Sequence, residues 1–272
     1  MKKNRIAKRF EDLAARGEKG FVAYITAGDP DLDATVERVR ALEAWGADVI
    51  ELGIPFSDPL ADGVANQRAA ERALKAGATL DGIFRAVARI REFSEIPIIF
   101  FSYLNPLFAK GFDCVADRAT EVGVDGMLLV DMCLEESEPF QHILQDRGLD
   151  HVVLVTPTTP ESRVAGLVRK GSGFVYCVSR AGVTGEQSEL QKDAREVLDR
   201  TRRHTGLPRA LGFGVSTPEQ AAAYAGMCEA VVVGSFLVNT FHEAGNTPAG
   251  LEAAGKKIRP LIDAVKGSVH HE

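Results

Sequence analysis

The chain has 272 residues, of which 45% are hydrophobic and 26% are charged, with 26 glycines and 12 prolines. This composition is typical of a folded globular protein and excludes a disordered chain, a collagen and a coiled coil. The formal net charge of -6 leaves no basic surplus for nucleic acid or an anionic membrane, although a local site can still bind a phosphorylated metabolite.

The first twenty residues predict an amphipathic helix with Ile6, Phe10 and Leu13 on one face, and they lack the apolar stretch of a signal peptide. The longest apolar run, VVVGSFLV, contains Gly and Ser and is shorter than the ~20 residues that span a bilayer. The four cysteines form no CxxC pair, and the six histidines have no metal-binding spacing. We therefore expect a cytoplasmic protein with reduced thiols and no metal.

Short runs of β-branched and apolar residues recur along the chain and predict strands. These runs are FVAYI (21–25), DVIEL (48–52), PIIFF (97–101), GMLLV (126–130), HVVLV (151–155), FVYCV (174–178), RALGF (209–213) and AVVVG (230–234). Segments with helical periodicity separate them. In the first of these segments, apolar residues recur on one face from Leu32 to Leu42, with Asp29 as the expected cap and Gly46 as the expected end. A last helix is expected over 247–266.

Strands that are continuous apolar runs are buried on both faces, which favours a parallel sheet covered by helices. Eight strand-helix units within one domain length favour a (β/α)8 TIM barrel, with an open doubly wound sheet as the alternative. No GxGxxG motif follows the first strand, so a dinucleotide-binding sheet is disfavoured. We expect residues 1–272 to form a single (β/α)8 barrel domain with an extra N-terminal helix.

Two acidic residues follow the second predicted strand, in the longest inter-strand segment. Glu51 lies near the end of that strand, where an unpaired carboxylate is costly and tends to stay protonated, as suits a general acid or base. An ion pair with Lys or Arg on a neighbouring strand is the alternative. Asp62, in the loop IPFSDPLADG, can bring a second carboxylate towards Glu51, whereas Asp58 is typical of an ordinary turn.

Two glycine-containing motifs predict an anion site. GFGVST (212–217) and GS (234–235) follow the last two strands, each at the start of an expected helix. Glycine allows close approach of the backbone, and helix N-termini present free N–H groups to phosphate. Simple helix capping by Ser216 and Ser235 is the alternative.

The segment SRAGVTGEQSEL (179–190) has the features of a lid, with Gly182 and Gly185 as hinges, although an ordinary surface loop fits the same composition. Tyr103 and Tyr176 are expected to line the pocket below it, with core packing as the alternative for both.

A series of motifs resembles the tryptophan synthase alpha chain family in order and spacing. The motifs are FVAYITAGDPD, DVIELGIPFSDPLADG, SYLNPLF, GVDGMLLVD, TPTTP, SGFVYCVSRAGVTG, GFGVSTPEQA and VVVGS. The resemblance covers residues 5–240. ELGIPFSDPLADG and SRAGVTG are close to diagnostic, whereas GFGVS and VVVGS occur in many phosphate-binding barrels.

The resemblance implies a (β/α)8 barrel that cleaves indole-3-glycerol phosphate to indole and glyceraldehyde 3-phosphate. It implies a tryptophan synthase beta chain as partner in an α2β2 hetero-tetramer, with pyridoxal phosphate on the beta chain and no cofactor on this one. Matching by motif makes Glu51 the general acid/base and Asp62 the carboxylate that holds the indole N–H. The expected substrate-binding residues are Tyr24, Tyr103, Tyr176, Thr184, Gly185, Phe213, Gly214, Gly234 and Ser235.

The sequence departs from the family pattern at four positions. Val64 and Cys133 stand where the family usually has proline, Asn66 stands where it often has an aliphatic residue, and Ala23 replaces the proline of FVPY. Val64 and Cys133 fall on loops that the family uses near the beta chain. A stand-alone lyase, an inactive ligand-sensing subunit and a phosphate-binding isomerase are the alternative functions. The last two are disfavoured by the pair of acids and by ELGIPFSDPLADG.

Overall fold

The computed structural model describes residues 4–179, 187–212 and 214–267. In it, eight parallel strands pair in chain order from β1 to β8, and β8 pairs with β1 to close the barrel. The strands are β1 (Gly20–Thr26), β2 (Val49–Gly53), β3 (Ile98–Ser102), β4 (Gly126–Leu129), β5 (Asp150–Val155), β6 (Val175–Val178), β7 (Arg209–Gly212) and β8 (Ala230–Val233). The predicted barrel is thus confirmed, and the open sheet is excluded.

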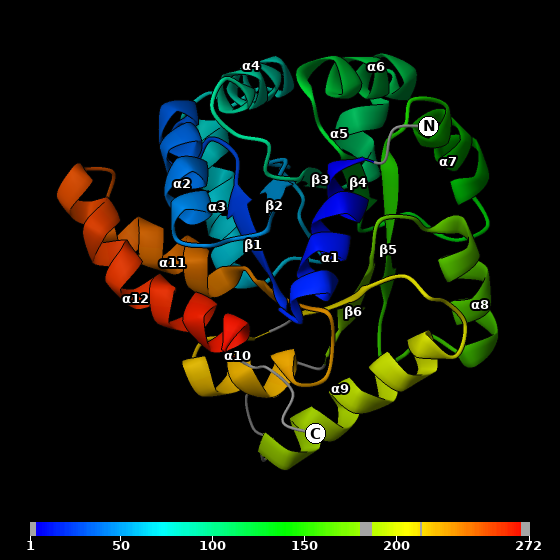
Figure 1. Ribbon diagram of the computed structural model, residues 1–272. Helices are drawn as coiled ribbons and strands as arrows, with labels where there is room; N and C mark the ends of the chain where they lie inside the picture. Colours follow the sequence, from blue (N-terminus) through cyan, green and yellow to red (C-terminus); the bar gives the residue numbers. More distant parts are fainter. Residues whose placement is uncertain (1–3, 180–186, 213, 268–272) are drawn as a thin grey trace.

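Helices surround the strands, and α1 lies across the middle of the view in Figure 1. The helices are α1 (Arg5–Arg16), α2 (Leu32–Ala44), α3 (Val64–Lys75), α4 (Leu80–Arg91), α5 (Leu104–Phe108), α6 (Phe112–Val122), α7 (Ser137–Asp146), α8 (Glu161–Lys170), α9 (Gln187–Arg202), α10 (Pro218–Ala225), α11 (Ser235–Ala244) and α12 (Pro248–Lys266). No helix in these described ranges is long and apolar enough to cross a membrane.

The core has two main parts, one between the strands and the outer helices and one inside the barrel. Ile6, Phe10 and Leu13 of α1 are buried against the inner part, which includes Val22 and Phe174 from the strands. The amphipathic face predicted for the N-terminal segment therefore covers one end of the barrel.

The prediction that Asp29 caps α2 is wrong. The cap is Asp31, whose Oδ1 accepts a hydrogen bond from Ala34 N at 2.6 Å. Asp29 is instead bound by Arg72 of α3 through two hydrogen bonds of 2.7 Å each. This pair connects the loop after β1 to the helix that begins beside the candidate site.

One hydrogen-bond motif recurs where the strands begin. In each case one residue lies shortly before a strand, and its partner lies on the preceding strand. The first residue donates its backbone N–H to the carbonyl of the partner, and its side-chain oxygen accepts the backbone N–H of the partner. The four pairs are Asp48 with Phe21 (2.9 and 2.8 Å), Asp125 with Ile98 (2.8 and 2.8 Å), Ser172 with His151 (2.8 and 3.0 Å), and Glu229 with Arg209 (3.1 and 2.8 Å). We call these pairs the reciprocal pairs.

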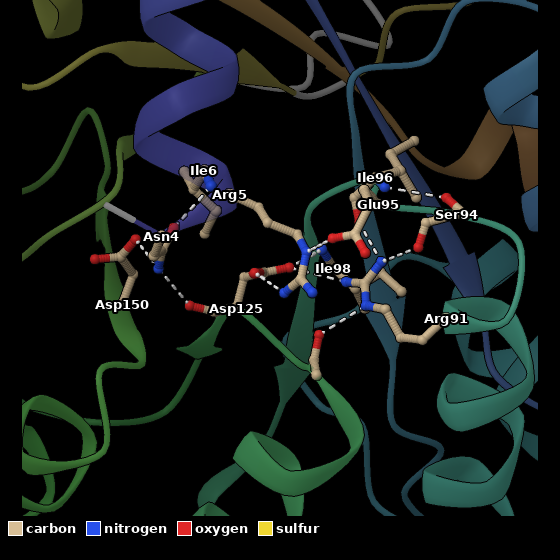
Figure 2. A network of polar contacts seen from close by, with 11 residues as sticks. Asn4, Arg5, Ile6, Arg91, Ser94, Glu95, Ile96, Ile98, Asp125 and Asp150 are labelled. Atoms are coloured by element: carbon tan, nitrogen blue, oxygen red, sulfur yellow. Dashed lines mark hydrogen bonds and ion pairs between the residues drawn. The ribbon is translucent and has the colours of Figure 1, made fainter. Parts of the chain in front are cut away.

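Asp125 is the centre of a wider polar network around its reciprocal pair (Figure 2). Its carboxylate accepts hydrogen bonds from Arg5 at 3.0 Å and from Arg91 at 2.9 Å, and its backbone carbonyl accepts one from Asn4 at 2.9 Å. Asn4 also donates to Asp150 at 2.6 Å. The start of α1 is thereby attached to β3, β4 and β5.

Candidate active site

A cavity of about 730 Å³ opens at the carboxyl ends of the strands, where α/β barrels hold their active sites. Its lining combines Glu51 and Asp62, the Glu243–Lys257 ion pair, aromatic and aliphatic side chains, and glycines of the loops after β7 and β8. Most of the acids, aromatic rings and glycine motifs predicted from the sequence therefore line this one cavity.

Glu51 lies on β2 between Tyr24 of β1 and Ile99 of β3 and is 1% exposed. Neither of its carboxyl oxygens has a hydrogen-bond partner within the described ranges, so the predicted alternative of a structural ion pair is not found there. Burial raises the pKa of Glu51 to about 8, because the charged form loses its hydration. At neutral pH this carboxyl holds a proton that it can donate.

Asp62 lines the same cavity from the loop between β2 and α3. The loop is fixed by hydrogen bonds from Asp62 N to Pro59 O at 3.0 Å and from Gln67 Nε2 to Asp62 O at 2.8 Å. Burial raises the pKa of Asp62 to about 6, a smaller rise than for the fully enclosed Glu51. At neutral pH the two acids therefore differ, with Glu51 mainly protonated and Asp62 mainly ionised.

Tyr24 lines the cavity beside Gly53, which is diagonal to it on β2 and has no side chain. A Cβ at Gly53 would overlap the Tyr24 ring, which also packs edge-on against Phe101 with centroids 5.2 Å apart. Tyr176 lies in the same way over Gly212 of β7 and lines the cavity too. Tyr176 therefore lines the cavity, and the alternative that it serves only in core packing does not hold.

Tyr103 is placed differently, because it is not among the described residues that line the cavity. Its hydroxyl accepts a hydrogen bond from Ala61 N at 2.8 Å, and its ring packs on Phe56 with centroids 5.3 Å apart. Tyr103 therefore fixes the loop that carries Asp62.

The glycine motifs form a further part of the cavity wall, which Gly214, Gly234 and Ser235 line. Gly234 is the N-cap of α11 and makes no side-chain capping bond, so the first N–H groups of this helix are available to an anion. Gly214 has a φ of +73°, which favours glycine.

Capping by Ser216 and Ser235 does not explain the two motifs. Thr217 caps α10 by accepting a hydrogen bond from Gln220 N at 3.3 Å, while the Ser216 hydroxyl contacts Gln220 Oε1 at 3.2 Å. Ser235 is the first residue of α11 rather than its cap.

Thr184, Gly185 and Phe213 lie outside the described residues, as does most of the predicted lid at 179–190. Within the described ranges, no group of three or more His, Cys, Asp or Glu side chains could hold a metal ion.

Several features of the site were missed in the sequence, including the polar side chains of Asn239, Thr240, Glu243 and Lys257. Gly53 and Gly212 admit the tyrosine rings, and a glycine inside a strand is itself a signal of such close approach. Asn66 was noted only as a departure from a family pattern, yet it lines the cavity.

A family model described as "Tryptophan synthase alpha chain" matches residues 10–265. A protein of that name from Opitutus terrae is 45% identical over 250 residues, covering 92% of this chain and 94% of its own length. The Caulobacter vibrioides protein of the same name is 48% identical over 270 residues, covering 98% of each.

Solved structures give the same match. The tryptophan synthase alpha subunit from Legionella pneumophila superposes with a TM-score of 0.89 at 38% identity, covering 96% of this chain and 98% of that one. A chain from the tryptophan synthase a2b2 complex of Pyrococcus furiosus has a TM-score of 0.84 at 38% identity, covering 90% of this chain and 98% of that one.

Proposed function

The chain belongs to the tryptophan synthase alpha chain family, and we propose that Glu51 and Asp62 carry out the reaction of that family at the carboxyl end of the barrel. The protein is a lyase of tryptophan biosynthesis that cleaves indole-3-glycerol phosphate to indole and glyceraldehyde 3-phosphate. The observation that carries the residue assignment is the buried, unpartnered and protonated carboxyl of Glu51 in the same cavity as an ionised Asp62.

In the first step Glu51 donates its proton to carbon 3 of the indole ring. The ring nitrogen then carries positive charge and keeps its hydrogen, which the Asp62 carboxylate accepts as a hydrogen bond. The raised pKa of Glu51 supplies the proton at neutral pH, and the lower pKa of Asp62 keeps the counter-charge in place.

In the second step the Glu51 carboxylate takes the proton from the hydroxyl on the carbon attached to the ring. The electrons of the O–H bond form the aldehyde, the carbon–carbon bond breaks, and its electrons return to the ring to give indole. Glu51 regains one proton for the one it donated, so the cycle closes without a metal or a Schiff base.

The glycine motifs hold the substrate phosphate. Gly214 and Gly234 allow their backbone to approach it, Ser235 offers a hydroxyl, and the start of α11 provides free N–H groups and a favourable dipole. The indole ring then lies towards Phe101, on the side where Tyr24 packs.

The partner of the chain is the tryptophan synthase beta chain. Leu60 lies in the active-site loop and Val64 directly after it, and they are 91% and 61% exposed, while Phe108 at the end of α5 is 62% exposed. We assign these three side chains to the surface that contacts the beta chain, because burial of such a patch favours association.

The proposal also covers the cofactor, the domain organisation and the location of the chain. The chain needs no cofactor of its own, pyridoxal phosphate is held by the beta chain, and residues 1–272 form one domain. The four cysteines are free thiols, as expected in the reducing cytoplasm, which is the proposed location.

An indole-release assay with indole-3-glycerol phosphate, with and without a tryptophan synthase beta chain, tests the function. We expect slow release by the chain alone, faster release with the beta chain, and competitive inhibition by glycerol phosphate. Absence of indole in both conditions contradicts the proposed chemistry, and non-competitive inhibition contradicts the phosphate position.

A further inference from the structure

Asn66 carries a buried polar atom for which the described part of the chain provides no partner. It lies in the first turn of α3 and lines the same cavity as Glu51 and Asp62, and its Oδ1 atom accepts no hydrogen bond there. A buried acceptor without a donor is costly, so such an atom indicates a bound group that supplies one.

The position of Asn66 follows from the packing of α3 beside α11 and β1. Ala69 of α3, Val238 of α11 and Tyr24 of β1 form one apolar cluster. Residues three apart lie on the same face of a helix. Asn66 therefore lies one turn closer than Ala69 to the N-terminus of α3, and Ser235 lies one turn closer than Val238 to the N-terminus of α11. Asn66 is therefore level with the start of α11, at the phosphate side of the cavity.

The substrate has three donor groups outside its phosphate, namely the indole N–H and two hydroxyls. On the proposed function, Asp62 accepts the indole N–H, and Glu51 takes the proton of the hydroxyl next to the ring. The hydroxyl on the middle carbon of the glycerol chain is left, adjacent to the carbon that bears the phosphate. A phosphate dianion has no hydrogen to donate, so it cannot satisfy Asn66 Oδ1.

We propose that Asn66 accepts a hydrogen bond from this middle hydroxyl and thereby selects substrates that carry it. The inference rests on the proposed function, since it takes the positions of the indole and the phosphate from it. Much of the cavity lining is apolar, including Phe101, Val130 and Leu154, so an unbound hydroxyl there loses its hydration without compensation.

The test measures Asn66→Leu against two ligands, indole-3-glycerol phosphate and its analogue with a plain propyl chain, indole-3-propanol phosphate. We expect kcat/KM for the first to fall about tenfold, mainly through KM, because one hydrogen bond is lost. The dissociation constant of the hydroxyl-free analogue is expected to change less than about twofold, since it never makes that bond. Arg68→Leu, an exposed site on the same helix, is the matched control and should leave both values unchanged.

Each outcome decides between distinct explanations. If kcat/KM for the substrate and affinity for the analogue fall equally, Asn66 contacts the phosphate or only shapes the cavity, and the inference is overturned. An unchanged kcat/KM overturns it as well. Failure of the wild-type protein to release indole contradicts the proposed function itself, whereas the Asn66 comparison is read only when the wild type is active. Should Asn66→Leu fail to fold, Asn66→Ala carries the same expectation.

Discussion

Glu51, in the middle of β2, and Asp125, directly before β4, are both buried acids of the same barrel, yet their surroundings are opposite. Asp125, 4% exposed, accepts hydrogen bonds from Ile98 N and from the guanidinium groups of Arg5 and Arg91. Glu51, 1% exposed, has no partner among the described residues. The barrel therefore uses partnered acids where the strands begin, which stabilises the fold, and leaves Glu51 unpartnered in the wall of the cavity, where it is available to the substrate.

Glu51→Gln is expected to have the largest effect, and what it loses is rate rather than stability. Loss of the proton donor should reduce indole release by about 10²- to 10⁴-fold. The melting temperature should stay the same or rise, because no partner of Glu51 is lost. Indole release and thermal unfolding measure the two quantities. A variant with near-native turnover would remove Glu51 from the mechanism.

Asp125→Ala is expected to show the converse. Removing this acid leaves Arg91, whose side chain is 11% exposed, without its carboxylate, which should cost about 3 kcal/mol in the free energy of unfolding. Turnover per folded molecule should stay at the wild-type level. Denaturant unfolding and an assay at low temperature check both. A stable variant with reduced turnover would contradict the division between Asp125 as a structural acid and Glu51 as a catalytic acid.

The pH dependence of kcat/KM should sharpen the comparison further. Asp62 must be ionised and Glu51 protonated, so activity should fall below pH about 6 and above pH about 8, approaching tenfold per pH unit on each side. Asp62→Asn should remove the acid limb along with most of the activity. A rate that is flat from about pH 5 to pH 9 would show that neither acid controls it.

The raised pKa of Glu51 also predicts a pH effect on stability. The folded state holds the Glu51 proton up to a pKa of about 8, whereas an unfolded glutamate loses it near 4.5, so Glu51 costs stability increasingly as the pH rises between these values. The stability gained by Glu51→Gln relative to wild type should therefore be larger at pH 8 than at pH 4. An equal difference at both pH values would argue against a raised pKa.

Ser172→Ala is expected to have the smallest effect. Ser172 occupies the place of the acid in one reciprocal pair, and its hydroxyl accepts the His151 N–H at 3.0 Å. The same hydroxyl also donates a hydrogen bond to the Asp150 carboxylate, so the substitution removes two hydrogen bonds. The loss should cost about 1 to 2 kcal/mol, less than the loss of Asp125, with unchanged turnover. Urea unfolding of the two variants side by side gives the ratio, and a larger loss for Ser172→Ala would show that charge is not what distinguishes the pairs.

The sequence was sufficient for the barrel, because each strand is a continuous apolar run and each run is followed by a helix-period segment. The cap of α2 was predicted wrongly at Asp29, since its carboxylate binds Arg72, a residue too far along the chain for local pattern to reveal. Local pattern likewise predicted Glu51 near the end of a strand, whereas it lies in the middle of β2, and left open whether it is paired. That depends on which side chains the neighbouring strands supply.

The binding side of the site was less predictable than its acids. The Tyr24 and Tyr176 rings have room because Gly53 and Gly212 lie diagonal to them on the adjacent strands, and that proximity depends on strand register. Resemblance to a family points to residues that relatives share, and Asn66 departs from that pattern. Its importance emerges from the unsatisfied oxygen in the folded structure.

The reciprocal pairs have a further consequence for how the chain is assembled. They join β1 to β2, β3 to β4, β5 to β6 and β7 to β8, and so divide the closed ring into four two-stranded modules of similar construction. A break in the backbone between two modules leaves all four pairs within single fragments, whereas a break inside a module separates the members of one pair. Fragments cut between β4 and β5 or between β6 and β7 should therefore reassemble more readily than fragments cut between β5 and β6.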